Sequence, residues 1–136
     1  MTSSTSAADE MRKLYDLYMD AVDRRDWEAY RELFAYPWVW ESMPRGAMVI
    51  DDHASYMRMI QEGQENLKDK GWVRSQIDNI RAYPTALDAG LITVDVTRHR
   101  ADGSVVERKR GLYMLRRIDG RWKIVIVVDT PQFQNP

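Results

Sequence analysis

The segment DGSVVERKRGLYMLRRIDGRWKI, residues 102–124, is the strongest indication of the fold, because two Asp-Gly turn signals flank one long run of strand-forming residues. If both Asp-Gly pairs are two-residue hairpin loops, they fix which residues of neighbouring strands face each other. In that register Arg98 faces Glu107 and Asp95 faces Arg110, and both pairs join opposite charges. The segment therefore predicts the centre of an antiparallel meander.

The same register assigns the strand residues to two faces. One face should meet the helices and contains Ile92, Val94, Tyr113, Leu115, Trp122, Ile124, Ile126 and Val128. On the other face Arg110 also opposes Asp129, so that Asp95, Arg110 and Asp129 form a row across three strands. That face also carries an apolar stripe, which predicts a subunit interface and consists of Leu112, Met114, Val125 and Val127.

Helix signals precede the meander. Apolar residues at three-four spacing predict a helix over residues 7–24 after Ser6, and a second helix runs from Trp27 to about Phe34 after Asp26, ending before Pro37. Residues 38–42 and 46–50 predict a hairpin around Met43-Pro44-Arg45-Gly46. A third helix follows Asp51 and Asp52, and its apolar face is formed by Ala54, Met57, Ile60 and Leu67.

Turn signals after Gly71 divide the rest of the chain into four strands. The fold class is therefore α+β: three N-terminal helices and an antiparallel sheet, in the order helix, helix, hairpin, helix and four-strand meander. The 136 residues form one domain over positions 1–136, and we expect residues 1–6 to be flexible.

Composition excludes several classes of function. Twenty Lys and Arg balance 21 Asp and Glu, so no net positive charge attracts nucleic acid or anionic lipid. The absence of cysteine excludes disulfides, a thiolate nucleophile and Cys-based zinc sites. No signal peptide and no apolar run near ~20 residues is present, so we expect no membrane partner and a cytoplasmic location.

Two segments resemble the nuclear-transport-factor-two-like (SnoaL-like) superfamily. DRRDWEAYRELF (residues 23–34) looks like the signature of its second helix, and residues 102–124 look like its final strand pair. The resemblance covers nearly the whole chain. It implies a cone-shaped fold, in which the three N-terminal helices pack on a strongly curved antiparallel sheet that encloses an apolar ligand pocket. It does not select an activity, because the superfamily contains isomerases, dehydratases, cyclases, hydrolases and transport adaptors.

Within the superfamily, the match to the ketosteroid-isomerase branch is partial. Tyr18 falls at the position of that branch's oxyanion-binding tyrosine, but its catalytic aspartate falls at Ser42, beside Glu41. Its second aspartate falls at Gly111 or Leu112. Steroid isomerisation is therefore not expected, and FAYPWVWES (34–42) looks more like an uncharacterised bacterial group.

Tyr18 and Glu41 are the candidate catalytic residues. The Tyr18 phenol can donate a hydrogen bond to a ligand carbonyl, or it can be a core tyrosine. Glu41 lies among tryptophans, where a carboxylate acquires a raised pKa that suits a general base. Strand alternation opposes this role, because Glu41 faces away from the pocket if its neighbours Trp40 and Ser42 face it.

Aromatic residues at alternating or helical spacing are expected to line the pocket: Tyr15, Trp38, Trp40, Tyr113 and Trp122. The resemblance implies that Tyr18, Ser42 and Gly111 line it as well. The alternative is that the aromatic residues only fill the core. His53 and His99 have no second ligand at metal-binding spacing, so we expect no metal and no cofactor.

Epoxide hydrolases of this superfamily use two carboxylates around an arginine, as in the row of Asp95, Arg110 and Asp129. The predicted register places the row opposite the pocket, which favours structural ion pairs.

The leading hypothesis for function is a homodimer, formed through the sheet, that binds an apolar or aromatic small molecule. The alternatives are a cofactor-independent isomerase, dehydratase or hydrolase that uses Tyr18 and Glu41, and an adaptor whose sheet face binds another protein.

Overall fold

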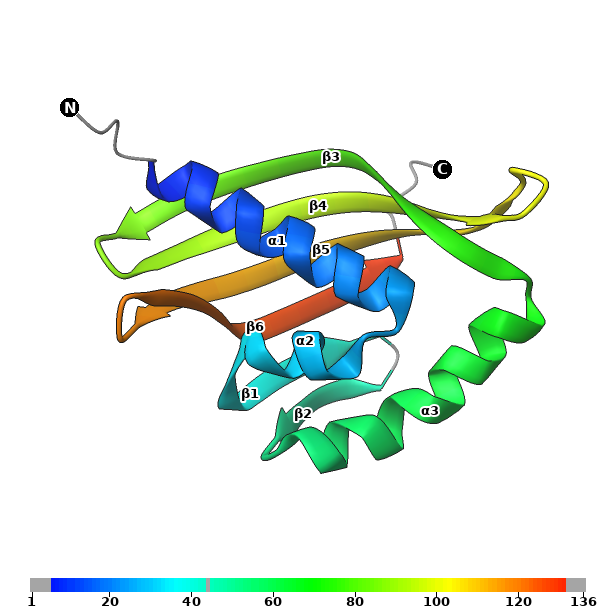
Figure 1. Cartoon of the computed structure of the whole chain (residues 1–136), viewed down its shortest axis with the longest axis horizontal. Helices are drawn as coiled ribbons and strands as arrows, with labels where there is room; N and C mark the ends of the chain where they lie inside the picture. The colour runs from blue at the N-terminus through cyan, green and yellow to red at the C-terminus, as the bar shows by residue number, and fades with distance from the viewer. Residues whose placement is uncertain (1–5, 44, 132–136) are drawn as a thin grey trace.

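The computed structural model describes residues 6–43 and 45–131, without the side chains of residues 61–68. Its elements, drawn in Figure 1, are α1 (Ala7–Arg24), α2 (Trp27–Glu32), β1 (Phe34–Ser42), β2 (Gly46–Ile50), α3 (His53–Asp69), β3 (Trp72–Ala86), β4 (Ala89–Arg100), β5 (Val105–Ile118) and β6 (Arg121–Pro131). Residues 1–5, Pro44 and the Leu67 side chain, to which some sequence expectations refer, lie outside this description.

Local capping explains where the helices begin. The side chains of Ser6 and Asp26 accept hydrogen bonds from the backbone N–H groups of Asp9 (3.1 Å) and Ala29 (3.2 Å), as the sequence predicted. Asp52 does the same for Ser55 at 2.8 Å, one residue before α3. The three helix starts therefore follow from single polar side chains.

The boundary between α2 and β1 differs from the prediction. The helix ends at Glu32, and β1 begins at Phe34 and runs through Pro37. The Ile124 N–H donates to the Leu33 carbonyl at 2.8 Å, and Phe34 pairs with Ile124. Pairing with the last strand thus begins β1 earlier than the local sequence indicates.

The sheet has six strands in the order β2-β1-β6-β5-β4-β3. It is mixed and not wholly antiparallel, because β1 pairs with β6 in the parallel direction. It is also open and less curled than the predicted cone, with β2 and β3 as its two edges. The four-strand meander from β3 to β6 is confirmed.

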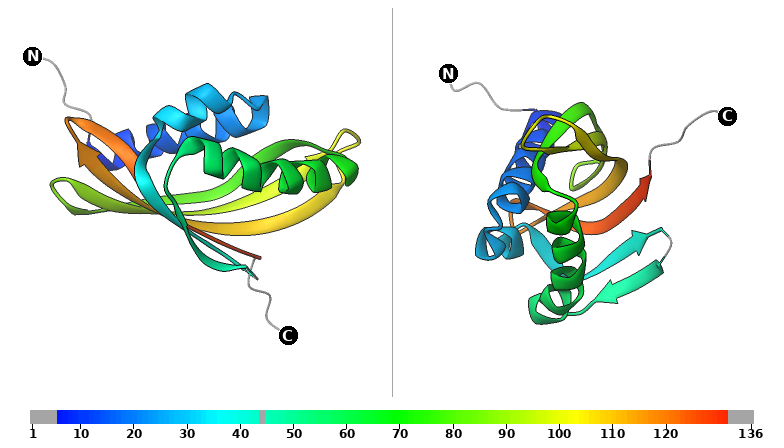
Figure 2. Two further views of the ribbon diagram at one scale, coloured as in Figure 1. Left: turned by 90° about the horizontal axis from the view of Figure 1, so that it is seen from below. Right: turned by 90° about the vertical axis from the view of Figure 1, so that its right-hand side faces the viewer.

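All three helices lie on one side of this sheet (Figure 2). α3 connects the two edge strands, so the chain crosses from one edge of the sheet to the other through this helix. The core between the layers contains Met11 and Tyr15 from α1, Trp38 from β1, and Ile92 and Leu115 from the meander. Among the described residues no helix is long and apolar enough to cross a membrane.

The predicted pairing of β4 with β5 is confirmed. Arg98 opposes Glu107 and Asp95 opposes Arg110, whose Nε lies 2.8 Å from Asp95 Oδ1. The loop itself has three residues, 101–103, because the Arg100 N–H donates to the Ser104 carbonyl and Gly103 has φ of 88°. A shift in pairing beyond Arg98 compensates for the extra residue.

The pairing of β5 with β6 departs from the prediction after its first residues. Asp119-Gly120 is the expected two-residue loop, with positive φ at both positions. However, Leu115 pairs with Ile124 and Met114 with Ile126, so Val125 is an extra residue, a β-bulge.

The bulge reverses the faces of all later residues of β6. Val127 is buried among the core residues, whereas Ile126 pairs with Met114 and Val128 with Leu112 on the outer face. Asp129 opposes Gly111 and not Arg110. The predicted row of Asp95, Arg110 and Asp129 is therefore wrong at its third member, and Ile126 and Val128 do not face the helices.

Candidate functional site

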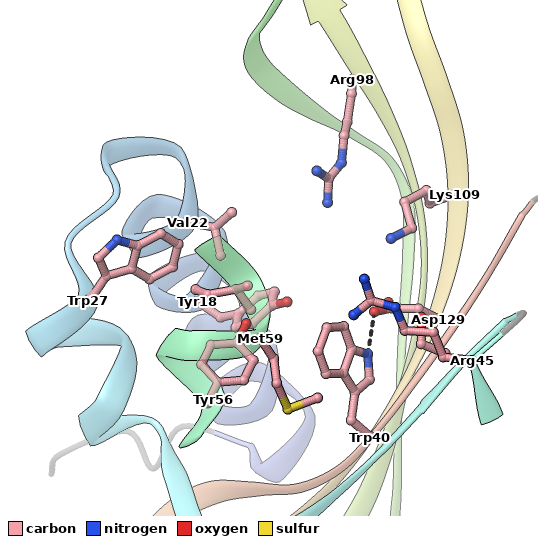
Figure 3. A pocket seen from close by; sticks show the side chains of 12 residues that line it. Tyr18, Val22, Trp27, Trp40, Arg45, Tyr56, Met59, Arg98, Lys109 and Asp129 are labelled. Atoms are coloured by element: carbon pink, nitrogen blue, oxygen red, sulfur yellow. Dashed lines mark hydrogen bonds between the residues drawn. The ribbon is translucent and has the colours of Figure 1, made fainter. Parts of the chain in front are cut away.

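A cavity of about 220 Å³ lies between the helices and the end of the sheet (Figure 3). It is lined by Tyr18, Val22, Trp27, Trp40, Ser42, Arg45, Tyr56, Met59, Ile60, Arg98, Lys109 and Asp129. The helices supply a mostly apolar wall, and the sheet with the β1–β2 turn supplies a polar wall. The two walls therefore offer different chemistry to one ligand.

A buried tyrosine pair supports the helix wall. The Tyr30 hydroxyl donates to the Tyr56 hydroxyl at 2.6 Å, and the two rings stack with centres 5.1 Å apart. The pair connects α2 to α3 directly. Because both side chains are buried and bonded to each other, the Tyr56 ring is held at the edge of the cavity.

The polar wall depends on the parallel pairing of β1 with β6. Trp40 opposes Val127 and Ser42 opposes Asp129, and all four side chains point to the helix side. The Trp40 indole Nε1 donates to Asp129 Oδ2 at 2.9 Å, which Figure 3 shows as a dashed line. This bond fixes the one carboxylate among the described residues that line the cavity.

Three cationic side chains surround the same space. Arg98 comes from β4, Lys109 from β5 and Arg45 from the turn before β2. In Figure 3 the Arg98 and Lys109 head groups lie on the sheet side, facing the helices. The pocket expected to be apolar is therefore charged on its sheet side.

Tyr18 lies where the apolar and polar walls meet. Its hydroxyl oxygen is 3.5 Å from that of Tyr113, and its ring centre is 5.5 Å from that of Tyr30. Burial raises the pKa of Tyr18 to about 12, and the Asp129 carboxylate raises it as well. Tyr18 is therefore a neutral hydrogen-bond donor at any physiological pH.

A second, smaller cavity of about 40 Å³ adjoins Tyr18 and is lined in part by Tyr15, Gly111 and Tyr113. A Cβ atom at position 111 would lie 2.7 Å from Tyr113 Cε1. Only glycine lets the Tyr113 ring lie against the strand and approach Tyr18. Gly111 therefore affects the site indirectly, by allowing the Tyr113 ring to take this position.

The remaining residues of the sequence prediction lie elsewhere. Trp38 is 1% exposed and packs on Phe34, with ring centres 4.4 Å apart. Trp122 is also buried, and its Nε1 donates to Glu10 Oε2 at 3.0 Å. Glu41 pairs with Val128 on the outer face, because Trp40 and Ser42 face the cavity. Asp129, and not Glu41, is therefore the carboxylate in a position to act in this cavity.

Sequence reasoning missed most of the polar wall. Arg98 continues the inward alternation of Val94 and Val96, and Lys109 continues that of Gly111 and Tyr113, so both positions were accessible from the register. Asp129 was not, since its orientation depends on the bulge at Val125.

In the described part of the chain, no group of three or more His, Asp or Glu side chains is arranged to hold a metal ion. His53 is 3.4 Å from the Tyr36 hydroxyl, and His99 contacts the Gly103 carbonyl and Gln76. Both histidines have local structural partners.

Helices on one face of a mixed six-stranded sheet, with a cavity between the layers, define the NTF2-like class of proteins. The chain belongs to the family described as NTF2-like protein (DUF6841), whose model matches residues 9–132. No curated protein matches the chain at a significant level.

Solved structures with the same fold share little sequence with the chain. An NTF2-like protein of unknown function from Pseudomonas putida KT2440 has a TM-score of 0.77 at 19% identity, covering 98% of this chain and 92% of its own. A ketosteroid isomerase-like protein from Erwinia carotovora atroseptica SCRI1043 has a TM-score of 0.71 at 16% identity, covering 96% of this chain and 100% of its own. The hexachlorocyclohexane dehydrochlorinase LinA-type3 from Novosphingobium barchaimii LL02 has a TM-score of 0.69 at 16% identity, covering 91% of this chain and 85% of its own. At these identities the likeness shows the fold alone.

The tyrosine cluster predicts a loss of stability at alkaline pH. A phenol with a folded pKa above its unfolded value near 10 stabilises the fold fully below pH 10, and this contribution disappears as pH rises through the folded pKa. For Tyr18 the window is pH 10 to about 12, and burial also raises the pKa of Tyr15, Tyr30, Tyr56 and Tyr113.

We therefore expect the urea midpoint to fall steeply between pH 10 and 12, together with delayed tyrosinate absorbance at 295 nm. Tyr18→Phe should make the fall shallower, and Tyr83→Phe, at an exposed position in β3, is its matched control. A midpoint that stays constant to pH 12 would contradict the expectation.

Proposed function

We propose that this protein binds a small molecule with one aromatic or similarly flat apolar ring in the cavity between its helices and sheet. The observation that carries the proposal is the cavity of about 220 Å³. An apolar cavity of about 150 Å³ is enough to bind benzene. The volume therefore suits one ring with short substituents.

The side chains around the cavity support this size and shape. The Trp40 and Tyr56 ring centres lie 5.7 Å apart at 55°, which leaves edges and faces for contact with another ring. Met59 adds a flexible thioether beside them. The Tyr18 hydroxyl supplies a hydrogen-bond donor that orients a ligand carbonyl.

Filling the cavity tests this function. Acetophenone and ethylbenzene should both raise the unfolding temperature of the wild type, and calorimetry should give one site per chain. Met59→Trp should reduce the affinity for both ligands at least about tenfold, because the new indole occupies their space. Ala54→Trp, at an exposed position of the same helix, should keep wild-type affinity. Binding that survives Met59→Trp would place the ligand elsewhere.

The second candidate function is enzymatic proton transfer in the same cavity. The favouring observation is that Asp129, held by Trp40, lines the cavity together with Tyr18. A carboxylate takes a proton from carbon, and a phenol stabilises the negative oxygen that forms. In this role Asp129 replaces Glu41 of the sequence hypothesis. The names of two proteins of this fold support the proposal: one is a dehydrochlorinase, and the other is described as ketosteroid isomerase-like.

Hydrogen exchange tests this activity directly. In D₂O the protein should accelerate deuterium incorporation into the methyl group of acetophenone, followed by NMR. Asp129→Asn should lower the accelerated exchange rate about 10²-fold or more, and Tyr18→Phe should lower it by a similar factor. Asp95→Asn, on the outer face, is the control. An unaccelerated rate in the wild type would reject proton transfer on this substrate class and leave binding standing.

The outer face of the sheet is proposed as the interface of a homodimer in the cytoplasm. The bulge changes the stripe that forms it: Val127 is buried, and Ile126 and Val128 join Leu112 and Met114. Helices cover the other face only (Figure 2). A dimer would bury an apolar stripe that is otherwise partly exposed to water, and it would cover the surface on which the adaptor hypothesis depends.

Light scattering at micromolar concentration should give twice the chain mass. Met114→Glu should yield monomers, because it places one charge per subunit in the interface. Leu87→Glu makes the same kind of change at the exposed β3–β4 loop and should remain dimeric. A monomeric wild type would contradict the homodimer and favour the adaptor hypothesis, in which the outer face binds another protein.

A further inference from the structure

The charges that line the cavity are unbalanced. Arg45, Lys109 and Arg98 face it, and Asp129 is its carboxylate. Within the described residues Arg45, Lys109 and Asp129 form no ion pair, and Asp129 is engaged by the Trp40 indole. Among the described residues, with Glu107 beside Arg98, three cations stand against two carboxylates. Asp23 and Arg25, which also lie near Arg98, cancel each other in this balance. One monoanion would balance the group.

Arg98 is held rigidly at this site. Its guanidinium carbon lies 4.9 Å from the centre of the Trp72 ring, which also carries Arg25 at 4.6 Å. Its Nε lies 3.3 Å from Glu107 Oε1, and its side chain is only 16% exposed. The guanidinium is therefore preorganised and largely withdrawn from water.

Two donors of Arg98 nevertheless have no acceptor. Nε and Nη1 are both buried without a hydrogen-bond partner among the described residues, although Nε is close to Glu107. Arg98 Nε and Glu107 are close enough to form an ion pair, but the Nε–H bond does not point at the carboxylate and makes no hydrogen bond. These two atoms have almost no accessible surface, so a ligand in the cavity meets the positive charge of Arg98 at the remaining part of the guanidinium, which lines it.

We propose that Arg98 and Lys109 form an anion subsite that receives the carboxylate of a small aromatic acid, whose ring lies against Trp40, Tyr56 and Met59. The guanidinium supplies a charged donor where it lines the cavity, and Lys109 adds a point charge. The charge balance favours a monoanionic carboxylate over a dianionic phosphate. The subsite rests on the proposed function, because it specifies the head group of the ligand that fills the cavity.

Paired probes test the subsite by calorimetry. Benzoate and benzamide have the same shape and differ in charge, so the wild type should bind benzoate at least about tenfold more tightly. Arg98→Gln should weaken benzoate about tenfold and change benzamide less than about twofold. Arg110→Gln removes the same charge from the outer face and should change neither affinity.

Glu107→Gln gives an independent measurement if Arg98→Gln fails to fold. Loss of the competing carboxylate should tighten benzoate about threefold or more without affecting benzamide. Met59→Trp should weaken both probes, which places them in the cavity.

Equal affinity of the wild type for benzoate and benzamide would overturn the subsite and leave the ring-binding function intact. The same conclusion follows if Arg98→Gln and Arg110→Gln weaken benzoate equally, or if Glu107→Gln leaves benzoate unchanged. Absence of binding of either probe at millimolar concentration would overturn both the subsite and the one-ring function.

Discussion

The extra residue Val125 in β6 controls which side chains of the last strand reach the cavity. Before the bulge Ile124 points to the helices, and after it Val127 and Asp129 do. Without the bulge the alternation would place Ile126 and Val128 inward and Asp129 on the outer face, where Arg110 already pairs with Asp95. The carboxylate of the site, its bond to Trp40 and the composition of the outer stripe all depend on this single insertion.

The cavity combines two walls that differ in polarity because they come from different layers. The helices are amphipathic, and the faces that they turn to the sheet are apolar, so they contribute residues such as Tyr56 and Met59. The sheet wall lies at the end of the strands, where alternation carries the inward positions beyond the packed core and into charged residues, as from Val96 to Arg98. A ligand with an apolar ring and a polar end fits this division better than a hydrocarbon does.

Aromatic packing makes the site rigid. Tyr18 touches the rings of Tyr15, Tyr30 and Tyr113 at centre distances between 5.3 and 5.5 Å, and Tyr30 is bonded to Tyr56. On the polar side Trp72 and Trp40 hold Arg98 and Asp129. Arg98 and Asp129 are thus each positioned by an aromatic neighbour, which reduces the ordering required when a ligand binds.

The sequence by itself determined what depends on neighbouring residues: the caps at Ser6 and Asp26, the loop at Asp119-Gly120 and the pairing of Asp95 with Arg110. It also indicated Tyr18, Trp40 and Ser42 as residues of the main cavity, since alternation and helical spacing are local properties. Only the tertiary structure decided that β1 runs parallel to β6, that Val125 is a bulge and that Asp129 meets Trp40. The contacts between β1 and β6 join residues about 90 positions apart, and no local pattern reports a pairing that is fixed by packing between distant strands.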